Sequence, residues 1–376
     1  MSDVSKIPLF LFGNGLSMAL SPEFSLKKIT NKFLEGLDGD EKNFLVELCG
    51  GVDNLDFDDF ESNFSLIDDA FSSLKKYQRF IESNAGQVLL EKFNLSNPNL
   101  KQHEEIIKSL YDKYIFQILN LIQGNVTLVG INENLKEFSD FLSNQLANSS
   151  RGFVFTLNFD LLAETILLQN IGTNSITDFC ASANNLKGTS INKFDFDPAM
   201  NDDRHGDADI ELHHLHGSLS LFYDYTRNKA IKFKSEDIFQ NDLYKKVFED
   251  SLPLHPAIIT GGGKSTKITE YPFEFYHRCF KDYCNYVKFG KLFIVGYSFR
   301  DEHINELIKR WIDNSEDFTK GLLIIDYKTN KEEQEKFKNF VKKALKKRKK
   351  IPDDCFEFNG ANSIRDVEGT ILKSKD

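Results

Sequence analysis

The chain has 376 residues, of which 47 are Lys or Arg and 57 are Asp or Glu, so its formal net charge at pH 7 is −10. Hydrophobic residues make up 40% of the chain and charged residues 28%, as in globular proteins rather than disordered or membrane-spanning ones. An acidic chain is poorly suited to bind a phosphate backbone, so we expect no direct nucleic-acid binding. The length fits two domains, or one large domain that carries an insertion.

The sequence predicts a cytoplasmic protein with no membrane attachment. No apolar run reaches the roughly 18–20 residues of a membrane helix, and the N-terminus lacks the pattern of a secretory signal. The five cysteines are scattered and form no Cys-x-x-Cys pair. This spacing argues against a disulfide framework and against a four-thiolate zinc site.

The first predicted element is a buried strand at residues 7–12 (IPLFLF), which stops at the turn Gly13-Asn14-Gly15. Glycines in this place let backbone N–H groups approach a phosphate closely, and an ordinary strand-to-helix turn is the alternative. Met18 stands where the G-x-G-x-x-G dinucleotide pattern has its third glycine. The sequence therefore departs from that of a dehydrogenase.

A helical insertion is predicted from about residue 25 to 122, because apolar residues recur there with helical spacing. One face carries Phe64, Ile67, Phe71 and Leu74, and another carries Ile107, Tyr111, Tyr114, Ile118 and Leu121. The predicted organisation is thus a helical module at 25–122 inside a second domain formed by residues 1–24 and 123–376.

Short apolar runs follow the insertion and are interpreted as strands. They cover residues 125–130, 152–160, 210–217, 255–263, 291–298 and 321–327, and helices are predicted from about 161 and at about 272–288, 302–314 and 331–347. Residues 171–210 are polar and are expected to form a loop. Strands separated by helices indicate a parallel sheet, so the predicted fold class is α/β, a Rossmann-like parallel sheet with a large helical insertion.

A polar segment, Thr156-Leu157-Asn158-Phe159-Asp160, ends the second predicted strand. The carboxyl edge of a parallel sheet is where such folds bind ligands. The alternative is that an Asp or Asn caps the helix that follows.

Histidines gather at the end of the next strand, in His213-His214-Leu215-His216-Gly217. Histidine is the usual general base near pH 7, and the adjacent glycine is expected to leave room for a substrate. Strand alternation places His213 on the face opposite His214 and His216, which argues against a zinc site.

Three later segments have weaker signals. Residues 261–265 (GGGKS) resemble a P-loop, but Ile258 occupies the position of the first required glycine, so the match is false. The amides of residues 296–298 (GYS) stand at a strand end where they can meet a phosphate. Asp326 ends the last predicted strand, where a carboxylate can accept a hydrogen bond from a ribose hydroxyl. The basic run 342–350 is either a solvated helix face or a contact for nucleic acid or an acidic partner.

Taken in order, these segments resemble the sirtuin family. The resemblance rests on G-N-G-L-S (13–17), T-L-N-F-D (156–160), L-H-G (215–217), P-A-I-I-T-G-G (256–262), G-Y-S-F (296–299) and the strand that ends at Asp326. With the helical insertion and the D-D-F-E segment at 58–61, the chain looks like the bacterial sirtuin-like proteins of antiphage defence, which hydrolyse NAD rather than deacylate proteins. Sirtuin deacylases carry a cysteine-based zinc module after the catalytic histidine, whereas residues 218–255 contain no cysteine.

The resemblance implies cleavage of the nicotinamide–ribose bond of NAD, without a metal. It assigns catalysis to Asn158, His216 and Asp160, and NAD binding to Gly13, Asn14, Gly15, Ser17, Thr156, Gly261, Gly296, Ser298 and Asp326. It further implies a homo-oligomer and a partner protein from the same defence operon. A non-catalytic NAD or nucleotide sensor and an NAD-dependent protein deacylase are the alternative functions.

Overall fold

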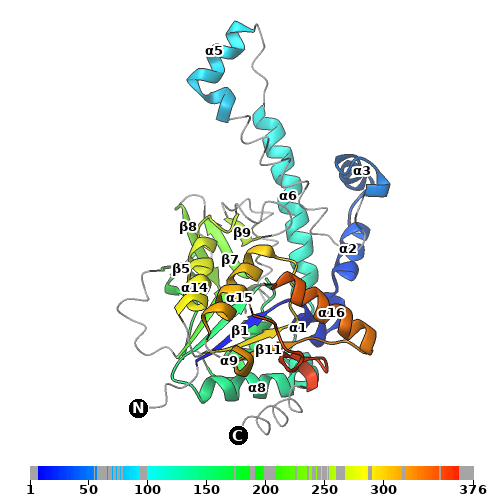
Figure 1. Cartoon of the computed structure of the whole chain (residues 1–376). Helices are drawn as coiled ribbons and strands as arrows, with labels where there is room; N and C mark the ends of the chain where they lie inside the picture. The colour runs from blue at the N-terminus through cyan, green and yellow to red at the C-terminus, as the bar shows by residue number, and fades with distance from the viewer. Residues whose placement is uncertain are drawn as a thin grey trace.

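A parallel sheet forms the centre of the molecule, with the strand order β12-β11-β10-β1-β2-β6-β3 (Figure 1). Its strands are β1 Pro8–Phe12, β2 Gly152–Thr156, β3 Ile176–Thr177, β6 Ile210–His214, β10 Lys291–Val295, β11 Leu322–Ile325 and β12 Phe356–Glu357. The computed structural model describes residues 7–363 apart from 55, 57–65, 67–69, 71–72, 74–76, 78, 94–99, 173–174, 187–190, 199–208, 225–226, 235–236, 239–242, 244–246, 248–251, 253, 260–266, 287–289, 316–317 and 347–348. The predicted α/β class with a Rossmann-like parallel sheet is confirmed.

Side chains of the central strand β1 alternate between two hydrophobic cores. Phe10 and Phe12 pack in the core that contains α8 and α9, whereas Leu9 and Leu11 pack in the core that contains α14, α15 and α16. These helices are α8 Lys136–Ala147, α9 Leu162–Asn170, α14 Phe273–Tyr286, α15 Glu302–Asn314 and α16 Lys331–Ala344. A strand that is covered on both faces has to be apolar throughout, which explains the unbroken run at 7–12.

A second sheet lies between β6 and β10 in the chain and is antiparallel, with the order β4-β5-β8-β7-β9. Its strands are β4 Cys180–Asn185, β5 Asn192–Phe196, β7 Gly217–Asp224, β8 Lys229–Phe233 and β9 Leu254–Ile258. Two predictions were therefore wrong. Residues 171–210 contain β3, β4 and β5 rather than only loop, and the run at 255–263 supplies β9 to the antiparallel sheet instead of the parallel one. Residues 171–210 are rich in polar residues and contain short strands, so this segment was interpreted as loop.

Helices fill the chain between β1 and β2 wherever it is described, and α6 extends away from the sheet with α5 near its far end (Figure 1). They are α1 Asn14–Leu20, α2 Leu26–Glu35, α3 Gly39–Leu48, α5 Asn84–Lys92, α6 Leu100–Gln123, α7 Leu128–Asn134 and α8. The ring of Phe33 on α2 packs edge-on against Tyr114 on α6, at 5.5 Å between ring centroids. The predicted face that contains Phe64, Ile67, Phe71 and Leu74 lies outside the described residues.

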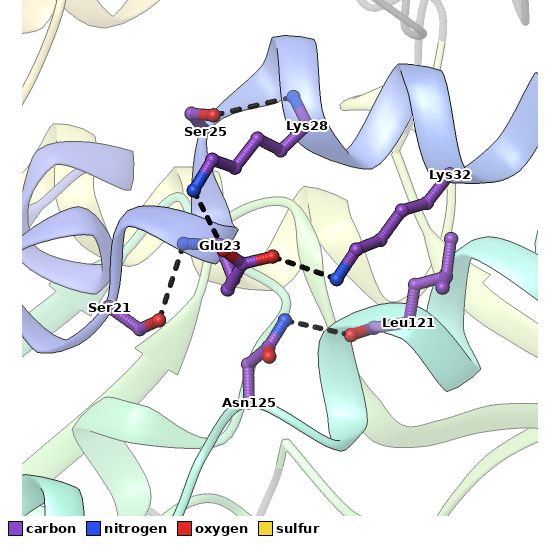
Figure 2. Close-up of polar contacts among 7 residues, drawn as sticks. All are labelled: Ser21, Glu23, Ser25, Lys28, Lys32, Leu121 and Asn125. Carbon is purple, nitrogen blue, oxygen red and sulfur yellow. Dashed lines mark hydrogen bonds and ion pairs between the residues drawn. The ribbon is translucent and has the colours of Figure 1, made fainter.

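Polar contacts hold the base of the helical region (Figure 2). Glu23 accepts hydrogen bonds from Lys28 Nζ at 2.7 Å and from Lys32 Nζ at 2.8 Å, so these two lysines fix the start of α2. The Lys28 bond, then the Lys32 bond, lowers the pKa of Glu23 to about 2. At the C-terminal end of α6, Asn125 Nδ2 donates to the Leu121 carbonyl at 2.9 Å and so satisfies a terminal carbonyl of that helix.

The strand predicted at 125–130 is not formed, because helix α7 begins at Leu128. Thr127 caps this helix by accepting a hydrogen bond from Gly130 N at 3.1 Å. Leu128 and Val129 are 56% and 65% exposed, so the apolar run does not mark a buried strand. The Thr127 cap therefore begins a helix at a segment where the apolar pattern had predicted a strand.

Within the described residues, no single helix is long and apolar enough to cross a membrane. Two helical segments, Lys113–Gln123 and Leu128–Asn134, meet at a bend of 53° and together reach the length and apolar composition of a membrane span. Ile115, Ile118 and Ile122 of this pair are buried in the hydrophobic core of the protein.

Candidate active site

Loops from several parallel strands converge at one edge of the sheet. Phe12 of β1 pairs in register with Thr156 of β2 and Val295 of β10, and Thr156 pairs with His214 of β6. Parallel strands in register end at the same edge, so the segments that follow them meet there. They line a pocket with a volume of about 1370 Å³.

Most of the predicted site residues line this pocket. Those that do are Gly13, Asn14, Gly15, Asn158, Asp160, His216, Gly296, Ser298 and Asp326. Ser17 and Thr156 are buried and do not line it, while Gly261 lies outside the described residues. Phe24, Leu26 and Ile29 also contribute to the wall, so the beginning of the helical region borders the pocket.

Glycines bring the loops after β1 and β10 into close contact. Gly13 N donates to the Val295 carbonyl at 3.0 Å, and Gly15 N donates to the Gly296 carbonyl at 2.8 Å. A Cβ on Gly15 would lie 2.6 Å from Gly296 Cα. Gly296 has a φ of +65°, and a Cβ on it would lie 2.4 Å from Leu16 N. The contact between the loops therefore requires glycine. Because the two amides are committed to it, a phosphate would take its hydrogen bonds from other donors of the pocket.

Asn158 is fixed in one orientation by its own amide group. Its Nδ2 donates to the Gly13 carbonyl at 3.0 Å and to Ser17 Oγ at 2.9 Å. A carbonyl oxygen only accepts, so Nδ2 and not Oδ1 must face Gly13. Both N–H groups are used inside the protein. Asn158 can therefore offer Oδ1 to a ligand, as an acceptor for a hydroxyl group or a water.

Asp160 is tied to the same network. Ser17 Oγ donates to Asp160 Oδ2 at 2.5 Å, and Leu162 N donates to Asp160 Oδ1 at 3.0 Å. Burial raises the pKa of Asp160, and the bonds from Ser17 and Leu162 oppose that effect without cancelling it. Asp160 thus satisfies an amide at the start of α9, as the capping alternative predicts, and also borders the pocket.

His216 lies in the turn between β6 and β7 and is 5% exposed. Leu215 N donates to the Thr156 carbonyl at 2.9 Å, and Ile259 N donates to the His216 carbonyl at 2.8 Å. These bonds fasten the turn to β2 on one side and to the end of β9 on the other. The structure thereby places His216 on the same pocket as Asn158 and Asp160.

The glycine after His216 has a different role from the one predicted. Gly217 has a φ of +87°, and a Cβ there would lie 1.9 Å from the Ala257 carbonyl oxygen. The space beside Gly217 is filled by β9, so it leaves no room for a substrate. Glycine is required here for the close approach of two strands.

The other two histidines of this segment do not line the pocket. His213 Nε2 lies 3.1 Å from Glu211 Oε2, and its ring stacks on Phe155 at 4.6 Å. His214 is 2% exposed and packs beside Tyr276. Across the described ranges, no group of three or more His, Cys, Asp or Glu side chains is placed to hold a metal ion.

The loop after β10 is held rigidly at the pocket wall. Tyr297 OH donates to Asn305 Oδ1 at 3.1 Å, and Asn305 Nδ2 donates to the Phe299 carbonyl at 2.9 Å. Phe299 has a φ of +57°, a conformation that surrounding contacts must impose on a side chain of this size. The loop presents Ser298 and Arg300 to the pocket.

Asp326 borders the pocket but is already bonded within its own loop. Its Oδ1 accepts from Tyr327 N at 2.8 Å, and its Oδ2 accepts from Lys328 Nζ at 2.9 Å. Each carboxylate oxygen can accept a second bond, so the predicted contact to a ribose hydroxyl remains open to it. Lys328, Lys336 and Arg300 also line the pocket, and these cations suit a ligand that carries phosphate groups.

Sequence reasoning missed two histidines near His216. The ring of His303 on α15 lies 6.2 Å from that of His216, and the ring of His277 on α14 lies 6.5 Å from it. Each is a single histidine on an amphipathic helix and cannot be distinguished in sequence from a residue of a solvated face.

The arrangement suits acid–base chemistry on an anionic ligand. An amide acceptor, an imidazole and a buried carboxylate line one pocket, and cationic side chains border the same cavity. Comparison with known protein families matches residues 152–349 to a family described as SIR2-like domain. A search of curated proteins finds no relative of the chain.

Proposed function

Because the chain belongs to the SIR2-like domain family, we propose that it is an NAD⁺ glycohydrolase that cleaves the nicotinamide–ribose bond. The family assignment implies NAD binding. The observation that supports hydrolysis is the fixed orientation of Asn158, which directs an acceptor rather than a donor to the ligand. A ribose hydroxyl or an attacking water needs such an acceptor, because each donates a hydrogen bond.

The proposed mechanism uses three side chains. Loss of nicotinamide leaves an oxocarbenium-like ribose, which a negative carboxylate such as Asp160 would stabilise. Oδ1 of Asn158 orients the water or a ribose hydroxyl, and His216 takes a proton from it. Arg300 and Lys328, which line the pocket, would hold the pyrophosphate, since the amides of Gly13 and Gly15 already donate to Val295 and Gly296.

Deacylation is the less favoured activity. The chain between His216 and β9 forms β7 and β8 of an antiparallel sheet and contains no cysteine between residues 218 and 255. A cysteine-based zinc module therefore cannot form in that segment. A sensor that binds NAD without cleaving it would need neither the oriented amide of Asn158 nor an imidazole beside it.

We further propose that the activity depletes NAD in antiphage defence by abortive infection and depends on assembly into a homo-oligomer with a partner protein. Enzymes typically turn over at about 1–10³ s⁻¹, so an unrestrained NAD hydrolase would drain its own host. Exposed apolar side chains concentrate in the helical region and offer it a surface for assembly: Tyr77, Phe80, Val88, Leu89 and Phe93. The acidic side chains Asp53 and Asp56 belong to the same region.

The test is to incubate the purified chain with NAD, alone and with the proteins encoded beside it, and to measure free nicotinamide together with ADP-ribose and its cyclic form. We expect His216→Ala and Asn158→Ala each to lower nicotinamide release by about 10²–10⁴ while the proteins stay folded. His255→Ala on β9, which does not line the pocket, is the matched control. NAD binding without release of nicotinamide would favour the sensor. Release that requires an acylated peptide would favour the deacylase.

A further inference from the structure

Three histidine rings from three different elements meet at the His216 side of the pocket. The ring centroids of His277 and His303 are 5.3 Å apart, and both rings lie within 6.5 Å of His216. His277 comes from α14 and His303 from the first turn of α15. Of the three, only His216 borders the pocket.

His277 contacts the backbone that carries His216. Its Nε2 lies 2.9 Å from the Leu215 carbonyl oxygen. A carbonyl can only accept, so Nε2 must carry the proton, and the neutral ring has its lone pair on Nδ1. The Leu215 carbonyl belongs to the peptide bond that leads into His216. This hydrogen bond therefore sets the direction in which His216 leaves the backbone.

The surroundings keep His277 uncharged. Burial, then the neighbouring His303, lowers the pKa of His277 to about 4, against smaller opposing effects of the Leu215 carbonyl and Asp301. Charged groups near this cluster include Glu302, the first residue of α15, and also Arg300 and Asp160, which line the pocket that His216 borders. A proton on one ring makes protonation of a neighbouring ring less favourable, because like charges repel.

We propose that His277 is a positioning residue for His216, and that its neighbour His303 helps to keep His277 uncharged. The proposal rests on the proposed function only where it assigns His216 the part of a proton acceptor. The tautomer of His277 and its coupling to His303 are properties of the folded protein and need no turnover.

The first experiment therefore uses protein labelled with ¹⁵N at histidine, and follows ring nitrogens by NMR from pH 8 down to about pH 3, below the pKa of His277. We expect His277 to show the Nε2–H tautomer. In His303→Gln the ring resonances of His277 should titrate at higher pH than in the wild type, because a positive neighbour has been removed. An Nδ1–H tautomer, or a His277 midpoint that does not move, overturns the proposal even if the protein releases no nicotinamide.

The second experiment measures nicotinamide release by His277→Gln and His277→Leu, with His255→Gln as the matched control. Glutamine can still donate to the Leu215 carbonyl, so its rate should stay close to that of the wild type. Leucine cannot, and should lower kcat by roughly 10–10² through misplacement of His216, with little change in KM. Equal rates for the leucine and glutamine variants contradict the proposal.

Discussion

Ser17 and Asp160 lie 143 positions apart in the chain and are joined by a buried hydrogen bond of 2.5 Å. The bond links α1, which begins at Asn14 within the glycine turn, to the loop that carries Asn158. The same Ser17 oxygen accepts from Asn158 Nδ2 at 2.9 Å. A single hydroxyl group thus sets the positions of two predicted catalytic side chains. Any movement of α1 would be transmitted to both.

The first prediction concerns Asp160→Asn. The folded protein raises the pKa of Asp160, so the unfolded chain loses this proton at lower pH than the folded protein does. The charged carboxylate therefore costs stability, and that cost appears as the pH rises through the folded pKa. We expect Asp160→Asn to be at least as stable as the wild type at pH 8, with its advantage shrinking towards pH 4. Nicotinamide release should fall by about 10²–10⁴.

Urea unfolding at several pH values, together with nicotinamide release, checks this prediction. Ser17→Ala is the contrasting variant, because it leaves the buried carboxylate without its shortest hydrogen bond. It should be less stable than the wild type at pH 8. A stability advantage of Asp160→Asn that is the same at pH 4 and pH 8 would show that the raised pKa has no effect on folding.

The second prediction separates crowding from backbone strain at Gly217. Gly217 and Gly172 have nearly the same φ, +87° and +89°. A Cβ on Gly217 would lie 1.9 Å from the Ala257 carbonyl oxygen, whereas a Cβ on Gly172 would have no neighbouring atom within 4 Å. Gly172→Ala should therefore cost about 1 kcal/mol from strain alone. Gly217→Ala should cost well above 2 kcal/mol, because β9 has to move. Thermal unfolding of both variants measures the difference, and equal costs would show that β9 yields easily.

The α/β class and the parallel strands could be predicted because their residues carry strong local signals. The run at 7–12 is apolar on both faces, and Asn158 and His216 each stand next to a strand end that the pattern marks clearly. Topology then required the polar segments to meet, since parallel strands finish at one edge. The sequence therefore indicated which polar segments would meet at one pocket.

The remaining features depend on contacts between distant residues. Nothing in the sequence near Gly217 shows that Ala257 will lie against it. Nor does the sequence show that the backbone amides of Gly13 and Gly15 will donate hydrogen bonds to Val295 and Gly296. The role proposed for His277 depends on its hydrogen bond to the Leu215 carbonyl, 62 positions earlier in the chain. Strand β9 was assigned to the wrong sheet for the same reason, because its partner β7 is antiparallel and its own composition does not show this.

A third prediction concerns acid unfolding and Glu211. Burial alone would raise the pKa of Glu211, but the hydrogen bond and charge of His213, then Arg151 and Tyr283, lower it to about 2. The stabilisation is therefore present above the usual pKa of about 4.5 and is lost as the pH falls from there towards 2. We expect Glu211→Gln to lose about 2–3 kcal/mol at pH 7 and to unfold with a weaker pH dependence between pH 5 and 3.

Circular dichroism during acid titration checks that expectation. Glu47→Gln is the matched control, because Glu47 is exposed. The control should follow the wild-type curve throughout. If Glu211→Gln also followed it, the network of Glu211, His213 and Arg151 would contribute nothing to acid stability.

The last prediction concerns the basic run at 342–350, which the sequence leaves open as a solvated face or a partner contact. Lys349 Nζ donates to the carbonyls of Ile312, Asp313 and Ser315, at 3.2, 3.4 and 2.6 Å, and so satisfies the end of α15. Lys349→Ala should therefore cost about 1–2 kcal/mol of stability, since three terminal carbonyls lose a charged donor. Lys350→Ala, at the exposed neighbouring position, should change stability by less than about 0.5 kcal/mol. Urea unfolding of both variants gives the comparison. If the two lysines proved equivalent, the run would act as a solvated face and the cap at α15 would be dispensable.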